Sequence, residues 1–164
     1  KNMTTLQSNK KNILFFSSLF LTFVVLTYLF PYSGDDWAWG SEIGIERLET
    51  WFHGYNGRYA GNLLVLLITR SQILKVLTIA SSLFLICYLP KIYTNSNRLT
   101  LSIFSTFLLL LVPKQIFVQA ISWTSGYSNY IPPILITLIY FILIRNIFDI
   151  EKPNYKKYFS IIPK

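Results

Sequence analysis

Two adjacent carboxylates, Asp35 and Asp36, directly follow a long uncharged apolar stretch of the chain. Acids are costly to hold close to hydrocarbon, so carboxylates at the mouth of a membrane-spanning helix more often serve chemistry or ion binding than anchoring. A carboxylate in this position can accept the proton of a hydroxyl group, or it can help to bind a divalent cation. Asp35 and Asp36 are therefore candidate catalytic residues and candidate ligands of a divalent metal ion.

The same two residues also fit a purely structural role. Aspartate is favoured at the N-terminus of a helix, where its carboxylate accepts hydrogen bonds from free backbone N–H groups and complements the positive end of the helix dipole. We favour a chemical role because two further polar motifs are expected on the same side of the membrane. The sequence leaves open which of the two aspartates is the base.

These two motifs carry polar and aromatic residues that suit substrate binding. The first runs from Asn56 to Asn62 and contains Arg58, whose planar guanidinium can pair with a phosphate group. The second runs from Trp123 to Tyr130, and aromatic rings of this kind pack on the C–H faces of sugar rings. The candidate substrate-binding residues are Asn56, Arg58, Tyr59, Asn62, Trp123, Asn129 and Tyr130.

Several of these residues have a simpler interpretation. Arg58 also suits contact with lipid headgroups, because a long basic side chain can extend to the membrane surface. Trp123 and Tyr130 also fit an aromatic belt at a membrane–water interface. For any single ring, the belt is the better explanation.

The composition indicates an integral membrane protein. Hydrophobic residues make up 52% of the chain and charged residues 13%, whereas soluble domains carry about 25% charged residues. The net charge of +8 is spread through apolar sequence, which argues against nucleic acid as a partner and is typical of basic cytoplasmic loops. The single cysteine, Cys87, excludes an intramolecular disulfide and a cysteine metal cluster.

Four apolar segments are expected to span the lipid bilayer, at about residues 13–32, 73–90, 99–112 and 131–144. The first is uncharged over its whole length and can cross a hydrocarbon layer of roughly 30 Å. It is too long for a signal peptide and lacks a small-residue cleavage pattern. Lys75 in the second span is expected to snorkel. Pro132 and Pro133 suit the beginning of the last span, where missing N–H donors matter least.

Two outer loops are expected between these spans, at residues 33–72 and 113–130. In the first loop, the spacing of Ile45, Leu48 and Phe52 predicts a helix over residues 41–52 that lies in the membrane interface. Asn56-Gly57 is a turn signal that ends this helix. A second short helix is expected over residues 59–69. In the second loop, the turn-forming residues between Trp123 and Tyr130 predict irregular structure.

We interpret other titratable residues of the first loop as solvent-exposed surface and not as site residues. Glu42, Glu46 and Glu49 recur on one side of the predicted helix 41–52, which we interpret as a solvated face. His53 is a lone histidine in a loop, and we interpret it as polar surface.

The distribution of charge predicts the orientation of the chain. With the N-terminus in the cytoplasm, residues 1–12, 91–98 and 145–164 lie inside and hold ten of the fifteen Lys and Arg but two of the seven acids. This asymmetry agrees with the positive-inside rule. We therefore expect a multi-pass protein of the cell membrane, with Asp35 and Asp36 on the outer side.

The order of these features resembles the beginning of the GT-C class of membrane glycosyltransferases. The motifs Gly34-Asp35-Asp36-Trp37, Asn56-Gly57-Arg58-Tyr59 with Asn62, and Trp123-x-x-Gly126-x-x-Asn129-Tyr130 are most similar to a bacterial multi-spanning family of undefined function that is related to that class. The likeness covers nearly the whole chain, although each motif is short. Members of the class usually have about twice as many spans, so we expect this chain to be the N-terminal part of a longer protein, forming one membrane domain over residues 1–164.

The resemblance implies an inverting transfer from a polyprenyl-phosphate-linked sugar to a glycan, lipid or protein acceptor of the cell envelope. It also implies that an aspartate of the first outer loop is the base, which is Asp35 here, with Asp36 supporting it or helping to hold a cation. Two other functions stay open. One is a transporter or flippase of envelope precursors, and the other is a non-catalytic membrane protein.

Overall fold

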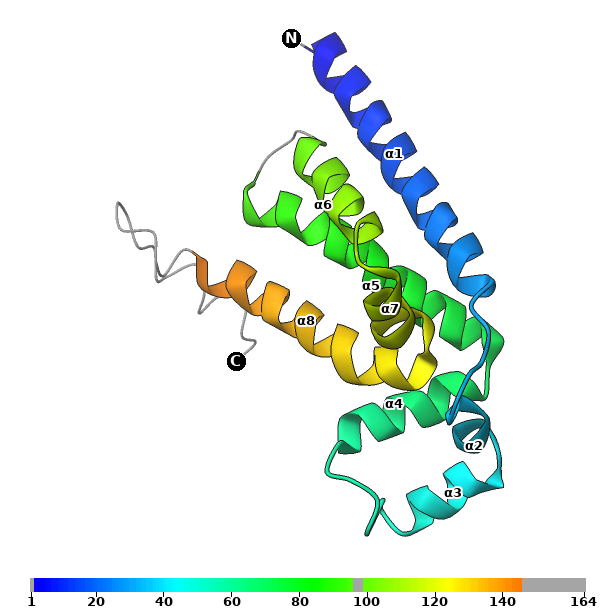
Figure 1. The fold of residues 1–164 in the computed structure, drawn as a ribbon. Helices are drawn as coiled ribbons and strands as arrows, with labels where there is room; N and C mark the ends of the chain where they lie inside the picture. Colours follow the sequence, from blue (N-terminus) through cyan, green and yellow to red (C-terminus); the bar gives the residue numbers. More distant parts are fainter. Residues whose placement is uncertain (1, 96–98, 146–164) are drawn as a thin grey trace.

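The computed structural model describes residues 2–95 and 99–145 (Figure 1). Within these ranges the chain forms helices joined by turns and contains no strand, so the expected all-α class is confirmed. Most of the expected cytoplasmic segment 145–164, and residues 96–98 of the segment 91–98, lie outside the described residues. The helices are α1 (Asn2–Tyr28), α2 (Asp36–Gly40), α3 (Glu42–Glu49), α4 (Tyr59–Thr69), α5 (Gln72–Tyr93), α6 (Thr100–Leu110), α7 (Lys114–Phe117), the π-helix η1 (Val118–Ser122) and α8 (Thr124–Ile144).

Three of the described helices are long and apolar enough to cross a membrane. They are α1 from Lys10 onward, α5 and α8. A fourth crossing requires that α6 and the α7–η1 segment count together, although these two pieces are bent by 98° relative to each other. Alone, the 11 residues of α6 span only roughly 16 Å. The expected four spans are therefore corrected to three, or to four if the bent pair counts as one span.

The bend after α6 has a local cause at Pro113. A proline ring disfavours the helical conformation of the residue before it, so a helix usually ends at or before that residue. Pro113 adopts an extended conformation (φ −53°, ψ 139°), and α7 starts at the next residue, Lys114. The expected span over residues 99–112 ends for this reason before it reaches membrane-spanning length.

The expected loop over residues 123–130 is wrong, because α8 already begins at Thr124. The turn-forming residues are accommodated within the helix. The Ser128 hydroxyl donates to the Thr124 carbonyl (3.0 Å), and the Asn129 amide donates to the Ser125 carbonyl (2.8 Å). Gly126 faces the end of η1 so closely that a Cβ atom there would lie 1.8 Å from the Gln119 carbonyl oxygen.

Pro132 and Pro133 lie inside α8 and not near its beginning, since the helix starts eight residues before Pro132. A proline in a helix removes one backbone hydrogen bond and leaves a carbonyl oxygen without its helical partner. The Thr137 hydroxyl donates to the Pro133 carbonyl (2.8 Å), which adds a side-chain contact over this stretch. The last apolar helix therefore extends over 21 residues, well beyond the expected 131–144.

The long helices share one apolar core, in which α5 contacts both α1 and α8 (Figure 1). Phe23 of α1, Leu83 of α5 and Ile131 of α8 are buried in it. A hydrogen bond of 2.6 Å between the Ser82 and Tyr127 hydroxyls also joins α5 to α8. Close packing and polar contacts of this kind hold apolar helices together where no water is present to drive their association.

The first apolar helix ends earlier than expected, at Tyr28 instead of Tyr32. The segment after it is held by Lys75 of α5, whose side chain is only 1% exposed. The Lys75 ammonium donates to the Phe30 carbonyl (2.8 Å) and lies 3.9 Å from the centroid of the Tyr32 ring. The expectation that Lys75 snorkels outward is wrong, because its charge is satisfied by the turn that leads to Asp35.

Helices α2, α3 and α4 form a small unit at one end of the bundle (Figure 1). The Arg70 guanidinium joins its parts by donating to the carbonyls of Trp39 (2.6 Å), Ser41 (2.7 Å) and Leu66 (3.0 Å). Trp39, Phe52, Val65 and Leu66 form a second buried cluster inside the unit.

Of the two helices that the sequence predicts in this unit, one is confirmed and the other is confirmed in part. The helix over residues 59–69 is confirmed as α4. The helix over residues 41–52 is confirmed only up to Glu49, because Trp51 and Phe52 both adopt positive φ angles (50° and 58°). This turn directs Phe52 into the cluster, where it is 1% exposed.

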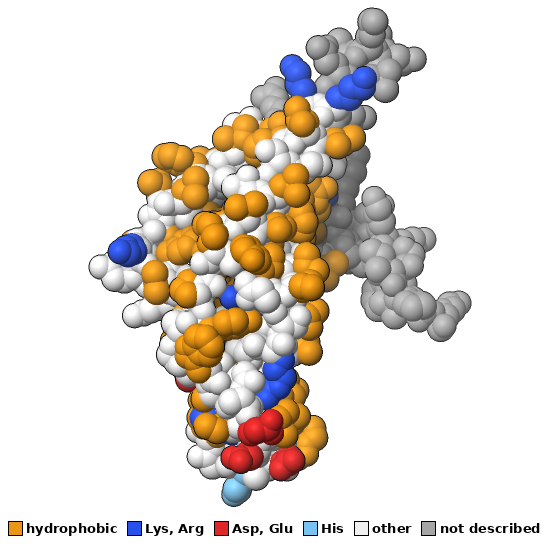
Figure 2. All heavy atoms as spheres, turned by 90° about the vertical axis from the view of Figure 1, so that its right-hand side faces the viewer, with side chains coloured by type: hydrophobic (Ala, Val, Ile, Leu, Met, Phe, Trp, Pro, Cys, Tyr) orange, Lys and Arg blue, Asp and Glu red, His pale blue; other side chains and the backbone are white. Residues whose placement is uncertain are grey.

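The charges are distributed unevenly along the molecule. Figure 2 shows the acidic side chains gathered at one end, basic side chains at the opposite end and also along the molecule as far as the acidic end, and hydrophobic side chains over much of the surface. All five acidic residues of the described ranges lie between residues 35 and 49, on α2, α3 and the turn before them. The candidate site lies at this acidic end.

Candidate functional site

Asp36 is a structural carboxylate in this fold. It is 1% exposed, and its two oxygens accept four hydrogen bonds. The backbone N–H groups of Ser33 (3.2 Å) and Thr124 (3.2 Å) donate to Oδ2. The backbone N–H (2.9 Å) and the hydroxyl (2.7 Å) of Ser125 donate to Oδ1.

These bonds attach the turn after α1 to the N-terminus of α8. A carboxylate at a helix N-terminus satisfies free N–H donors and complements the helix dipole. Asp36 therefore performs the capping role that the sequence offered as an alternative, but it caps a helix 88 residues away instead of the one that follows it. Its oxygens are occupied by donors, which leaves no free lone pairs for a substrate proton or a cation.

The neighbouring Asp35 has a different environment. Its Oδ1 atom is buried and has no hydrogen-bond partner among the described residues. Asp35 also lines a pocket of about 80 Å³ between α2, α4, the start of α8 and the turn before α4. A buried acceptor without a partner is unfavourable by about 1–3 kcal/mol, so a donor that enters this pocket gains a strong interaction.

Most of the predicted site residues surround this pocket. The predicted binding residues that line it are Asn56, Arg58, Asn62, Trp123, Asn129 and Tyr130, together with the catalytic candidate Asp35. Three motifs that are far apart in the sequence are therefore brought together in one place. Trp39, Tyr55, Val65, Ser125 and Gly126 complete the wall and were not identified from the sequence.

The asparagines of the second motif organise the loop itself. The Asn56 Oδ1 atom accepts hydrogen bonds from the Arg58 backbone N–H (2.9 Å) and from the Asn62 amide (3.0 Å). Asn62 is 3% exposed. Asn56 and Asn62 therefore fix the course of the chain at the pocket and leave the exposed Arg58 side chain available at its edge.

Close backbone approaches bring α4 and α8 to the pocket. A Cβ atom on Gly61 would lie 2.5 Å from the Asn129 Oδ1 atom, so only glycine allows this contact between α4 and α8. Gly34 adopts a positive φ angle of 58° and lies against the Trp123 ring. The Trp123 Nε1 atom is buried and, like Asp35 Oδ1, has no partner in the described part of the chain.

Arg47 stands behind the pocket wall and was missed in the sequence. Its guanidinium carbon lies 4.7 Å from the Trp39 ring centroid and 4.4 Å from that of Tyr55. Each such cation–π contact contributes about 0.5–2 kcal/mol, so Arg47 braces two rings that line the pocket. In the sequence, Arg47 stands among Glu42, Glu46 and Glu49, whose spacing indicates a solvated helix face. The sequence therefore does not predict that Arg47 contacts the Trp39 and Tyr55 rings. Only the position of Tyr55 beside Asn56 could have drawn attention to it.

A larger groove of about 710 Å³ adjoins the pocket, and Arg58, Asn129 and Tyr130 line both. Tyr59, the remaining predicted binding residue, lines this groove and not the pocket. The groove continues between α4 and α8, where its walls carry the apolar side chains of Leu64, Pro132, Pro133 and Ile136. The arrangement offers a small polar compartment at the end of a long apolar surface.

Tyr32, in the turn before Asp35, is affected by the charge of Asp36. Burial raises the pKa of the Tyr32 hydroxyl, and the nearby Asp36 carboxylate raises it further. Tyr32 therefore stays protonated at neutral pH. Its ring lies against the Lys75 ammonium, 3.9 Å from the ring centroid, and covers one side of this buried cation.

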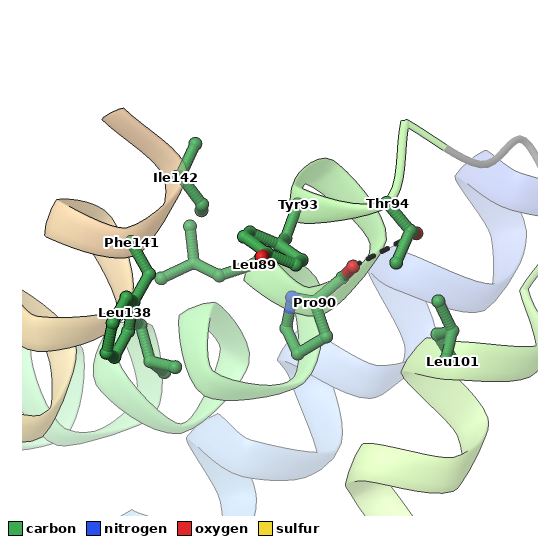
Figure 3. A pocket seen from close by; sticks show the side chains of 8 residues that line it. All are labelled: Leu89, Pro90, Tyr93, Thr94, Leu101, Leu138, Phe141 and Ile142. Carbon is green, nitrogen blue, oxygen red and sulfur yellow. Dashed lines mark hydrogen bonds between the residues drawn. The ribbon is translucent and has the colours of Figure 1, made fainter. Parts of the chain in front are cut away.

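A separate apolar cavity of about 400 Å³ lies between α5, α6 and α8, near the end of α5 (Figure 3). Seven of its eight lining residues are hydrophobic, and the hydroxyl of the eighth, Thr94, donates to the Pro90 carbonyl (3.2 Å). Its polar side-chain groups are the hydroxyls of Tyr93 and Thr94, and the lining contains no acidic or basic side chain. The chemistry-bearing residues are therefore those at the acidic end.

The residues described here contain no group of three or more His, Cys, Asp or Glu side chains that could hold a metal ion. Comparison of the chain with protein-family models, curated proteins and solved structures gave no match.

Proposed function

We propose that this chain is the N-terminal membrane part of a glycosyltransferase that moves a sugar from a polyprenyl-phosphate donor to a cell-envelope hydroxyl, on the outer side of the cytoplasmic membrane. One observation carries the proposal. Asp35 lines a polar pocket, and its Oδ1 atom is buried and lacks a hydrogen-bond partner among the described residues.

Asp35 is the base in this proposal. The acceptor hydroxyl donates to Asp35 Oδ1, and its oxygen then attacks the anomeric carbon of the donor sugar. The bond between that carbon and the phosphate oxygen breaks as the new glycosidic bond forms. The hydroxyl proton passes to Asp35, and the lipid phosphate leaves with the bonding electrons.

Asp36 is a positioning residue in the same scheme. Its four hydrogen bonds fix the turn that carries Asp35 against the start of α8. The division between the two aspartates is supported by their environments, because Asp36 has both oxygens occupied, whereas Asp35 lines the pocket and has a buried oxygen without a partner in the described chain.

The donor is assigned to the boundary between the pocket and the groove. Arg58 lies at this boundary, and its guanidinium can hold the donor phosphate through two parallel hydrogen bonds. The lipid chain then follows the apolar walls of the groove between α4 and α8. Trp123 and Tyr130 supply aromatic faces for the sugar.

The positions of the charges in the spanning helices give less support to a transporter, although the bent pair of α6 and the α7–η1 segment is an interrupted helix. A transport pathway requires polar or interrupted helices near the middle of the membrane. The two charged residues of α5 lie near its ends: Lys75 is one turn from the start and donates to the Phe30 carbonyl, and Lys91 is in the last turn.

The experiment uses the full-length protein in liposomes with a panel of polyprenyl-phosphate sugars that carry a radiolabel in the sugar. An envelope glycan fraction is supplied as acceptor on the outer side. We expect label to appear in the glycan together with free lipid phosphate. Movement of intact donor across the bilayer without transfer would identify a transporter instead, and neither reaction with any donor would overturn the proposal.

A further inference from the structure

A furrow lies between α1 and α5, at the opposite end of these helices from the candidate site. It has a volume of about 500 Å³. Its lining residues are Asn12, Ile13, Phe16 and Ser17 of α1 and Phe84, Tyr88 and Lys91 of α5. Because α1 and α5 run antiparallel, these residues lie around the middle of α1 and in the last half of α5.

The floor of the furrow is aromatic. The ring centroids of Phe16 and Tyr88 lie 4.9 Å apart in an edge-to-face arrangement, and those of Phe84 and Tyr88 lie 5.6 Å apart with nearly parallel planes. Interlocked rings of this kind form a rigid apolar surface. Such a surface suits a hydrocarbon chain lying along the helices.

One end of the furrow carries a positive charge. The Lys91 ammonium lies 4.8 Å from the Phe16 ring centroid, which keeps it over the aromatic floor. Asn12 and Ser17 add neutral polar groups to the lining. A ligand with an apolar chain and an anionic head would therefore contact both the rings and the cation.

Other cations increase the positive potential around Lys91. Lys10 is exposed and stands three and seven residues before Ile13 and Ser17, so it shares their face of α1. Arg145, at the end of α8, donates to the carbonyls of Ile92 and Tyr93 beside Lys91. The acidic residues of the described ranges all lie at the other end of the molecule, between residues 35 and 49.

We propose that this furrow is a binding site for an anionic phospholipid. Its phosphate is held by Lys91 and Lys10, and one acyl chain lies on Phe16, Phe84 and Tyr88. Basic pockets between helices at a cytoplasmic surface select anionic lipids in this way. The proposal does not depend on sugar transfer, since the two sites share no residue.

The test measures lipid binding to the full-length protein in a neutral detergent by native mass spectrometry, with phosphatidylglycerol and phosphatidylcholine of identical chains. We expect the wild type to prefer phosphatidylglycerol. Lys91→Gln should weaken phosphatidylglycerol binding about five-fold, since one basic residue near a lipid surface contributes about 1 kcal/mol. Phosphatidylcholine binding should not change.

The matched control is Lys114→Gln, which removes an exposed lysine of α7 that does not line the furrow. It should retain the full preference. Lys10→Gln, at an exposed position outside the packed core, provides a second variant if Lys91→Gln fails to fold, and it should also reduce the preference. Equal wild-type binding of the two lipids, or an equal loss in Lys114→Gln, would overturn the proposal.

Discussion

At the residue scale, the two neighbouring aspartates Asp35 and Asp36 have opposite environments. Asp36 accepts four hydrogen bonds and is buried, whereas Asp35 keeps a buried oxygen without a partner in the described chain. The difference arises because α8 begins beside Asp36 and uses its carboxylate as a cap. We therefore infer that Asp36 stabilises the fold, and we propose that Asp35 carries the chemistry.

Gly61→Ala is the sharpest residue-scale prediction about the pocket. The new Cβ atom would meet the Asn129 amide oxygen at 2.5 Å, so the Asn129 side chain must move away from the pocket. Because this is the far end of a flexible side chain, we expect an unchanged unfolding temperature. We expect sugar transfer to fall by about 10- to 100-fold, since small misplacements in a site have effects of this order.

Gly57→Ala is the matched control for Gly61→Ala. A Cβ atom at Gly57 meets no other heavy atom within 4 Å, although this residue lies in the same motif and lines the adjoining groove. Its transfer rate should stay at the wild-type level. Equal rates for both alanine variants would show that the contact between Gly61 and Asn129 does not shape the site.

At the element scale, the beginning of α8 decides where the third motif lies. Single-sequence patterns favoured a loop there because Ser125, Gly126 and Asn129 are frequent in turns. The helix forms because its N-terminus is capped by Asp36 from another part of the chain and because Gly126 permits close contact with η1. The cap comes from a residue 88 positions away, so local patterns could not predict that a helix starts here.

Helices that are marked by a local sequence pattern were predicted more accurately than the start of α8. The apolar helices around residues 13–32 and 73–90 and the short helix 59–69 follow from hydrophobic length and periodicity, and they correspond to α1, α5 and α4. The end of the helix over residues 41–52 was wrong because Trp51 and Phe52 turn into the second cluster. The turn results from tertiary packing, which the periodicity of apolar residues cannot predict.

Gly126→Ala tests the contact between η1 and α8. The added methyl group would lie 1.8 Å from the Gln119 carbonyl oxygen, which is backbone and cannot rotate away. The helices must separate, and we expect a loss of about 1–3 kcal/mol in unfolding free energy, as is usual for overpacking. The measurement is thermal unfolding in detergent, compared with Gly57→Ala. An unfolding temperature equal to that of Gly57→Ala would contradict this packing.

At the scale of the whole molecule, the helices place acids and the candidate site at one end and a basic furrow at the other. Most residues that line the pocket belong to the three sequence motifs, each of which combines polar and aromatic side chains next to apolar helices. The motifs could not identify Trp39, Tyr55 or Arg47, whose contribution depends on the packing of α2 and α3 against α4. The orientation of the molecule in a membrane stays a prediction from the charge distribution.

Cysteine labelling tests that orientation in intact cells. His53 is exposed in the turn between α3 and α4, and Cys87 is buried, so His53→Cys in a Cys87→Ser background provides one reactive thiol. We expect a membrane-impermeant maleimide to label this variant from outside. Lys10→Cys in the same background should react only after the cells are permeabilised. The reverse pattern of labelling would invert the proposed topology.

The central claim, that Asp35 is the base and Asp36 its positioning partner, is tested most directly by the transfer rate of Asp35→Asn in the full-length protein. The account predicts a fall of about 10²- to 10⁴-fold, the usual contribution of a general base, with an unfolding temperature equal to that of the wild type. Asp36→Asn, measured beside it, should lower the unfolding temperature. Wild-type transfer by a folded Asp35→Asn variant would contradict the account.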